Sequence, residues 1–189
     1  MRAKDILKPT LALFLICAVA AFLLALTNSQ TTQRISEIAL QTENQARAAL
    51  FPQASSFSDA KTVGDSSYFE ALDSAGRVIG YTFTTSAKGY GGDVQVMTGV
   101  AADGSVANIE ILDVSNETPG LGQNAKKDSF KAQFTGMQGV IGVSTASKTA
   151  QNGIDALTGA TYTSKAVAAA VNAALDLYAQ IPKGGESVG

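Results

Sequence analysis

Histidine is absent from this 189-residue chain, and cysteine occurs only once, at Cys17. Without an imidazole, the chain cannot build a Ser-His-Asp triad, a histidine-liganded zinc site or a histidine-ligated haem on its own. A single thiol excludes an intrachain disulfide, a Cys-x-x-Cys redox pair and an iron–sulfur cluster held by this chain alone. We therefore predict no catalytic or metal-binding residues, and any redox function would need an organic cofactor.

A strong charge of one sign is also missing. The chain has 14 basic and 16 acidic residues, for a net charge of -2, and it has no long basic run. This balance argues against a nucleic-acid partner, which would require a basic surface. Hydrophobic residues make up 46% of the chain, which is enough for one sizeable core and an appendage.

The most apolar segment lies near the N-terminus and predicts a transmembrane helix over residues 10–27. It carries no charge, and its length is near the lower limit of about 17 residues for crossing a bilayer. Arg2, Lys4 and Lys8 precede it, whereas the next basic residue is Arg34. The positive-inside rule then places residues 1–9 in the cytoplasm. We expect a single-pass protein of the cell (inner) membrane, with its C-terminal part on the periplasmic or extracellular side.

A cleavable signal peptide is the competing interpretation of this segment. The sequence Ala25-Leu26-Thr27 matches a small-residue cleavage site only poorly. Lipoprotein processing at Cys17 is disfavoured because the bulky Ile16 stands where a small residue would be expected. We therefore expect an uncleaved anchor, in which Cys17 faces lipid or packs as a small apolar residue.

The rest of the chain predicts an α+β fold, in which an antiparallel sheet domain flanked by helices follows the single N-terminal transmembrane helix. Residues 28–67 would form a connecting helix, ending at Leu50 before Pro52, and a Ser-rich loop from residue 53. The domain would occupy residues 68–182, with the terminal helices covering one face of the sheet, and 183–189 would be a flexible tail. The predicted strands are 68–73, 78–85, 94–100, 106–114 and 140–143, and the predicted domain helices are 126–134 and a C-terminal helix after residue 164.

A run of small and hydroxylated residues, 155–164, precedes the C-terminal helix. A hydroxyl side chain at this position would ordinarily be an N-cap, but that explains only one of Thr158, Thr161, Thr163 and Ser164. Gly159 would allow close backbone approach, and the free amides of the first helical turn could hold an anion. The segment therefore predicts a phosphate-binding site.

Three blocks of this sequence resemble the FMN-binding domain found in Rnf and Na⁺-pumping quinone reductase complexes. Asp155 followed by Thr-Gly-Ala-Thr-Tyr-Thr at 158–163 resembles the flavinylation motif of that family. Asn-Glu-Thr-Pro-Gly-Leu-Gly at 116–122 resembles its flavin-contacting loop, and Gly-Tyr-Gly-Gly-Asp-Val at 89–94 resembles a third block. The blocks occur in one order over roughly the last two-thirds of the chain, which makes the resemblance more specific than a single glycine motif.

The resemblance implies FMN joined covalently through a phosphoester bond to Thr163. A separate flavin transferase, using FAD and Mg²⁺ and releasing AMP, would form this bond, since the chain lacks a phosphoryl-transfer centre of its own. Covalent attachment would keep the flavin on a domain outside the cytoplasm, where no dependable pool of free FMN exists. Asp155 would assist recognition by the transferase or cap local backbone amides.

Further cofactor-binding residues follow from the same blocks. Glu117 and Thr118, fixed before a Pro-Gly turn, could hydrogen-bond the edge of an isoalloxazine ring and tune its potential, although a solvated Glu in an ordinary turn is the alternative. Tyr90 would lie at the flavin rim or cover the sheet edge. Asn116 stands where family members often have His, which removes a titratable group. The remaining expected cofactor-binding residues are Thr158, Gly159, Ala160, Thr161, Ser164, Gly120 and Leu121.

Among the complexes of this family, the chain most resembles the G-subunit family of Rnf-type ferredoxin:NAD⁺ oxidoreductases. The resemblance implies an electron carrier with no catalytic centre beyond its flavin, assembled with integral membrane and iron–sulfur subunits. Three alternatives remain: a C-subunit-like component of a Na⁺-translocating NADH:quinone reductase, a free-standing extracytoplasmic flavoprotein, and an anchored binding module without redox function.

Overall fold

The computed structural model describes residues 3–146, 149–150 and 152–182 of the chain. It divides into two compact units, residues 1–42 and 43–189, which are described separately. The first unit consists of the greater part of helix α1 (Ala3–Leu50), whose last turns belong to the second unit. The predicted tail, 183–189, lies outside the described residues.

Helix α1 contains the predicted transmembrane segment. Within the described part of the chain, it is the one helix long and apolar enough to cross a membrane, with a mean hydropathy of 2.6 over its most apolar window. Its large apolar side chains are exposed over residues 11–26, as expected for a surface that faces lipid. The helix continues to Leu50, directly before Phe51 and Pro52, which confirms the predicted end.

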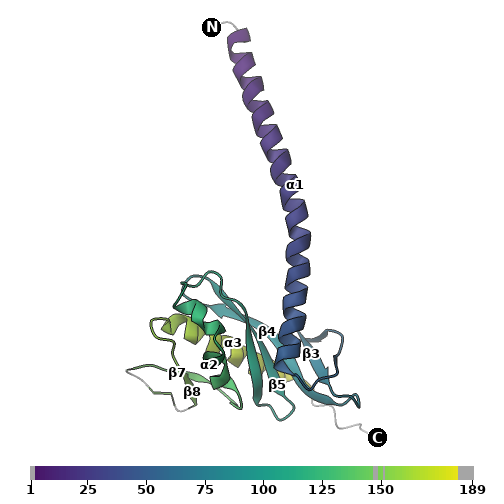
Figure 1. Ribbon diagram of the computed structural model, residues 1–189, viewed down its shortest axis with the longest axis vertical. Helices are drawn as coiled ribbons and strands as arrows, with labels where there is room; N and C mark the ends of the chain where they lie inside the picture. Colours follow the sequence, from purple (N-terminus) through teal and green to yellow (C-terminus); the bar gives the residue numbers. More distant parts are fainter. Residues whose placement is uncertain (1–2, 147–148, 151, 183–189) are drawn as a thin grey trace. The chain divides into compact units, whose positions relative to one another are not determined.

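The second unit is built on one antiparallel sheet (Figure 1). Its order is β1-β3-β4-β5-β6, with β2 also paired to β3. The four longer strands confirm the predicted sheet. The strands are β1 (Ser56–Phe57), β2 (Lys61–Val63), β3 (Ser66–Leu72), β4 (Val78–Lys88), β5 (Asp93–Ala101) and β6 (Val106–Asp113).

The prediction of a loop over residues 53–67 was wrong in part, because β1 and β2 form there. Both strands pair with β3, and Lys61 of β2 forms an ion pair with Glu70 of β3 at 2.7 Å between Nζ and Oε1. Strands of two and three residues are too short for alternation of apolar and polar residues to appear in the sequence.

The last turns of α1 and helix α3 cover opposite faces of the sheet, so the prediction that the terminal helices cover the same face was wrong. On β5, Val94 and Val96 point into the core that contains α3 (Thr161–Gln180), while Met97 packs with Leu50 and Phe51 at the end of α1. Side chains alternate between faces along a strand, and β5 has apolar side chains on both faces. Figure 1 shows α3 on the far side of the sheet from the last turns of α1.

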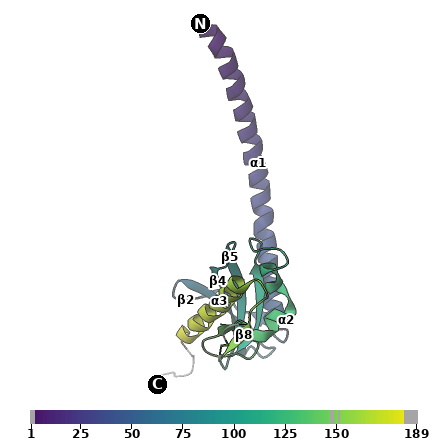
Figure 2. The ribbon, with the colours of Figure 1, turned by 90° about the vertical axis from the view of Figure 1, so that its left-hand side faces the viewer.

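Short elements connect β6 to α3. They are the helical turns η1 (Gly122–Lys126), α2 (Asp128–Lys131) and η2 (Ala132–Phe134), and the parallel strand pair β7 (Gly142–Ser144) and β8 (Gly153–Asp155). The predicted helix over 126–134 is therefore a series of short helical turns, and the predicted strand at 140–143 lies slightly later. Phe130 and Phe134 are buried edge-to-face, 5.7 Å apart. Figure 2 shows α2, β8 and α3 gathered on one part of the unit.

Candidate functional site

Only the last four residues of the hydroxylated run, 161–164, form the first turn of α3, and residues 155–160 precede the helix. The helix begins at Thr161, its N-cap is Ala160, and no side chain caps it, so the expectation of a hydroxyl N-cap was wrong. A turn over residues 157–160, with Gly159 at φ +73°, leads directly into the helix. The first intrahelical bond is donated by the Ser164 amide to the Ala160 carbonyl. The amides of 161–163 therefore form the electropositive end of the helix.

Ser164 stabilises this turn from inside the helix. Its hydroxyl donates to the Ala160 carbonyl at 3.0 Å and accepts from the Leu157 amide at 2.9 Å, and the residue is fully buried. Its role in the structure is to hold the preceding turn. Thr158 lines an adjoining hollow together with Asp155. Neither Ser164 nor Thr158 lines the cavity described next.

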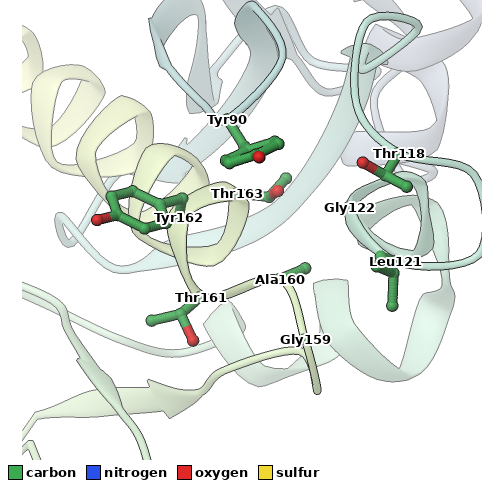
Figure 3. A pocket seen from close by; sticks show the side chains of 9 residues that line it. All are labelled: Tyr90, Thr118, Leu121, Gly122, Gly159, Ala160, Thr161, Tyr162 and Thr163. Carbon is green, nitrogen blue, oxygen red and sulfur yellow. The ribbon is translucent and has the colours of Figure 1, made fainter.

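A cavity of about 360 Å³ opens where the β4–β5 connection, the loop after β6 and the first turn of α3 meet (Figure 3). This volume is at the lower end of the range typical of small-molecule sites. The cavity joins residues from all three sequence blocks. Two of them, Gly122 and Tyr162, lie inside the blocks but were not among the predicted cofactor-binding residues. The residues that line it are Tyr90, Thr118, Leu121, Gly122, Gly159, Ala160, Thr161, Tyr162 and Thr163.

A buried hydrogen bond joins Thr163, which lines this cavity, to Glu117. The Thr163 hydroxyl donates to Oε2 of Glu117 at 2.5 Å, and Oε1 accepts from the Gly91 amide at 2.9 Å. Thr163 is 1% exposed and Glu117 is 3% exposed. The predicted role of Glu117 was to contact a flavin ring. In the structure, its carboxylate accepts a hydrogen bond from Thr163, the residue that would carry the flavin phosphate.

The electrostatics of Glu117 depend on hydrogen-bond donors. Burial, the largest influence, would raise the pKa of its carboxyl, but the Thr163 hydroxyl and the backbone amides of Gly91, Tyr90 and Gly92 together lower the pKa below its usual value. No Lys or Arg in the described part of the chain forms an ion pair with this carboxylate. The site therefore holds a buried carboxylate anion through a hydroxyl and amides alone.

Glycines make this close packing possible. A Cβ atom on Gly122 would lie 2.6 Å from both Oε2 of Glu117 and Oγ1 of Thr163. A Cβ atom on Gly89 would collide with Oε1 of the same carboxylate, and one on Gly91 with the Asn116 carbonyl. These positions have no room for a side chain because the Glu117 carboxylate, the Thr163 hydroxyl and the Asn116 carbonyl already occupy the space.

The Pro-Gly turn fixes the loop that carries Glu117. The Leu121 amide donates to the Thr118 carbonyl at 3.1 Å, and Gly120 has φ +78°, a conformation that glycine tolerates without strain. The Gln123 side chain donates to the Glu117 carbonyl at 3.0 Å. Gly120 thus shapes the turn, while Thr118 and Leu121 face the cavity.

Two exposed tyrosines flank the mouth of the cavity. Tyr90 is 76% exposed and Tyr162 is 69% exposed, and their ring centroids lie 6.4 Å apart. Figure 3 shows both rings on one side of Thr163, opposite Thr118 and Leu121. Tyr162 stands between two threonines of the hydroxylated run, which is the signal that could have identified it.

These features suit a phosphorylated aromatic cofactor. First-turn amides and a hydroxyl at a helix N-terminus can receive a phosphate, and neighbouring exposed aromatic rings can contact a flat ring system. Within the described residues, no group of three or more His, Cys, Asp or Glu could hold a metal ion. Fold and site together fit a domain that binds a flavin nucleotide.

Comparison with known proteins gives the same class. Residues 89–176 match the model of the FMN-binding domain family. The chain is 40% identical to the G subunit of the Na⁺-translocating ferredoxin:NAD⁺ oxidoreductase complex of Acetobacterium woodii, with 95% of each chain covered. It is 32% identical to the G subunit of the ion-translocating oxidoreductase complex of Methanosarcina acetivorans, covering 92% of this chain and 95% of that protein. The chain belongs to the G-subunit family of ion-translocating oxidoreductase complexes.

Solved structures share the fold. The C subunit of the Na⁺-translocating NADH-quinone reductase from Parabacteroides distasonis superposes with a TM-score of 0.55 at 22% identity, over 64% of each chain. NqrC from Shewanella oneidensis gives a TM-score of 0.51 at 17% identity, over 64% of this chain and 65% of that one. The matched part is thus a little under two-thirds of those proteins, and at these identities the likeness concerns the fold.

Proposed function

We propose that this protein carries electrons on FMN within an ion-translocating ferredoxin:NAD⁺ oxidoreductase complex, and that the FMN is esterified to Thr163. The observation that carries the proposal is the position of the Thr163 hydroxyl, at the helix N-terminus and on the wall of the cavity. Relatives named as the G subunit of such complexes, including that of the proton-translocating complex of Clostridium ljungdahlii at 32% identity over 84% of that protein, support the role.

Different residues of the cavity would contact different parts of FMN. Thr163 would provide the ester oxygen, and the first-turn amides of 161–163 would hydrogen-bond the phosphate. Tyr90 and Tyr162, exposed beside the cavity, would contact the ring system. FMN supplies the one- and two-electron redox chemistry that the side chains of this chain lack.

Helix α1 supports a location in the membrane. This helix would anchor the chain in the membrane as a single span, with the N-terminus in the cytoplasm and the flavin domain outside. The partners would be the integral membrane and iron–sulfur subunits of the complex, and a flavin transferase during maturation. An anchored carrier stays at high local concentration beside its redox partners without needing high affinity for them.

The function is tested in membranes that contain the whole complex with Thr163→Val in this protein. Ferredoxin-dependent NAD⁺ reduction should fall to background, while copurification of the other subunits stays unchanged. The matched control is Thr158→Val, which alters the same motif but lines the adjoining hollow and not the cavity itself, and it should keep most of the activity. Full activity of the Thr163→Val complex would contradict the proposal.

A further inference from the structure

The hydrogen bond between Thr163 and Glu117 joins a nucleophile to a base. The Thr163 hydroxyl is the atom that would attack phosphorus, and its proton points to Oε2 of Glu117 at 2.5 Å. Nucleophile–base pairs of this kind, within hydrogen-bond reach and with the base held by a third group, are the usual signature of an activated hydroxyl. Here the third group is the Gly91 amide, which bonds Oε1.

The burial of Glu117 indicates that its hydrogen bond with Thr163 has a functional role. A carboxylate that is 3% exposed, with no ion-pair partner among the described residues, carries a desolvation cost that packing alone does not require. Such groups cluster at functional sites. The glycines at 89 and 122 leave the space that the carboxylate occupies beside the hydroxyl.

Resting on the proposed attachment of FMN, we propose that Glu117 is the general base for flavinylation of Thr163. The acceptor domain would therefore supply the proton acceptor for its own modification, and the transferase would supply the bound dinucleotide and Mg²⁺. Protein kinases divide phosphoryl transfer in a similar way, with a carboxylate that accepts the proton of the substrate hydroxyl.

Oγ1 of Thr163 attacks the phosphorus of the FMN half of FAD and forms an O–P bond, while the bond from that phosphorus to the bridging oxygen breaks and AMP leaves. Glu117 takes the Oγ1 proton on Oε2 and later releases it to solvent. No electron is transferred, and FAD is the co-reactant. A carboxylate of low basicity suffices because nucleophile bonding is weak in the loose transition state.

Two substitutions separate a base from a residue that merely packs. Glu117→Gln keeps the shape of the side chain and can keep both hydrogen bonds, with its oxygen toward the Gly91 amide and its NH₂ toward the Thr163 oxygen, but it cannot take a proton. Glu117→Asp keeps the carboxylate but is shorter, so it disturbs the packing more. If Glu117 only packs, the Gln variant should be flavinylated faster than the Asp variant. If Glu117 is the base, the Asp variant should be flavinylated faster than the Gln variant.

The experiment follows flavinylation of the purified full chain in detergent, with flavin transferase, FAD and Mg²⁺, by intact mass over time. Thermal melting of each variant is recorded in parallel. The matched control is Glu110→Gln, which removes the same charge from a partly buried residue that pairs with Lys131 instead. We expect Glu117→Gln to slow attachment at least about 100-fold, the usual contribution of a general base, and Glu110→Gln to leave the rate unchanged.

The outcomes are distinguishable. Faster attachment in Glu117→Asp than in Glu117→Gln, despite an equal or lower melting temperature for Asp, supports the base even if both variants lose stability. A Gln variant that equals wild type, or exceeds Asp, would overturn it. If wild type itself gains no FMN on Thr163, the proposed attachment fails and the inference fails with it. If wild type is modified and Gln is too at the same rate, only the inference fails.

Discussion

Replacing Gly122 with Ala would place a methyl group against both members of the central hydrogen bond. The new Cβ would lie 2.6 Å from Oε2 of Glu117 and from Oγ1 of Thr163, whereas ordinary contact begins at 3.4 Å. The carboxylate cannot retreat freely, because the Gly91 amide holds its other oxygen. Overpacking costs about 1–3 kcal/mol, and a lost hydrogen bond to a charged group costs about 1.5–3 kcal/mol.

We expect a net loss of about 2–4 kcal/mol in the free energy of unfolding, since the two costs overlap. For a unit of this size, the melting temperature should fall by about 5–15 °C, measured by circular dichroism of the full chain in detergent. The matched control is Gly99→Ala, whose Cβ would press on Phe51 at 3.0 Å on the opposite face of the sheet. Both variants should lose stability, but only Gly122→Ala should also slow FMN attachment. Unchanged stability and attachment in Gly122→Ala would refute the reasoning.

Three further predictions follow from the same contacts. Hydrogen bonds lower the pKa of Glu117, so its contribution to stability is fully present above the pKa of a free Glu, about 4.3. That contribution is lost as the pH falls through the pKa of the folded state. The difference in unfolding free energy between wild type and Glu117→Gln, measured by denaturant titration, should therefore shrink below about pH 4. Tyr90→Ala and Tyr162→Ala should change the unfolding free energy by less than about 0.5 kcal/mol yet alter the absorption or fluorescence of bound flavin, and an unchanged spectrum in both would remove them from the site. Phe134→Ala, at a fully buried position, should cost about 3–5 kcal/mol in the same titrations, and a loss below about 1 kcal/mol would contradict the assigned core.

Elements with a strong local pattern were predictable from the sequence. The four longer strands show alternation or β-branched runs, and the apolar segment of α1 has an uninterrupted composition. The strands β1 and β2 were missed because two or three residues carry no period. The opposite placement of the terminal helices was missed because β5 is apolar on both faces, and the sequence does not say which helix covers which face.

The sequence blocks predicted which residues form the site, but not how their side chains contact one another. Motif resemblance selected Thr163, Tyr90 and the loop after β6, and the structure brings all three to one cavity. The sequence predicted that Glu117 hydrogen-bonds the flavin ring, because the sequence alone does not show which side chain a loop carboxylate contacts in the fold. Its contact with Thr163 spans 46 positions, and only the folded sheet brings these side chains together.

Attachment of FMN to Thr163 is tested most directly by the intact mass of the chain after expression beside a flavin transferase, with peptide mapping, for wild type and Thr163→Val. We predict an FMN-sized addition on the wild-type peptide that contains Thr163, and none in the variant. An addition that persists in Thr163→Val, or no addition in either protein, would contradict it.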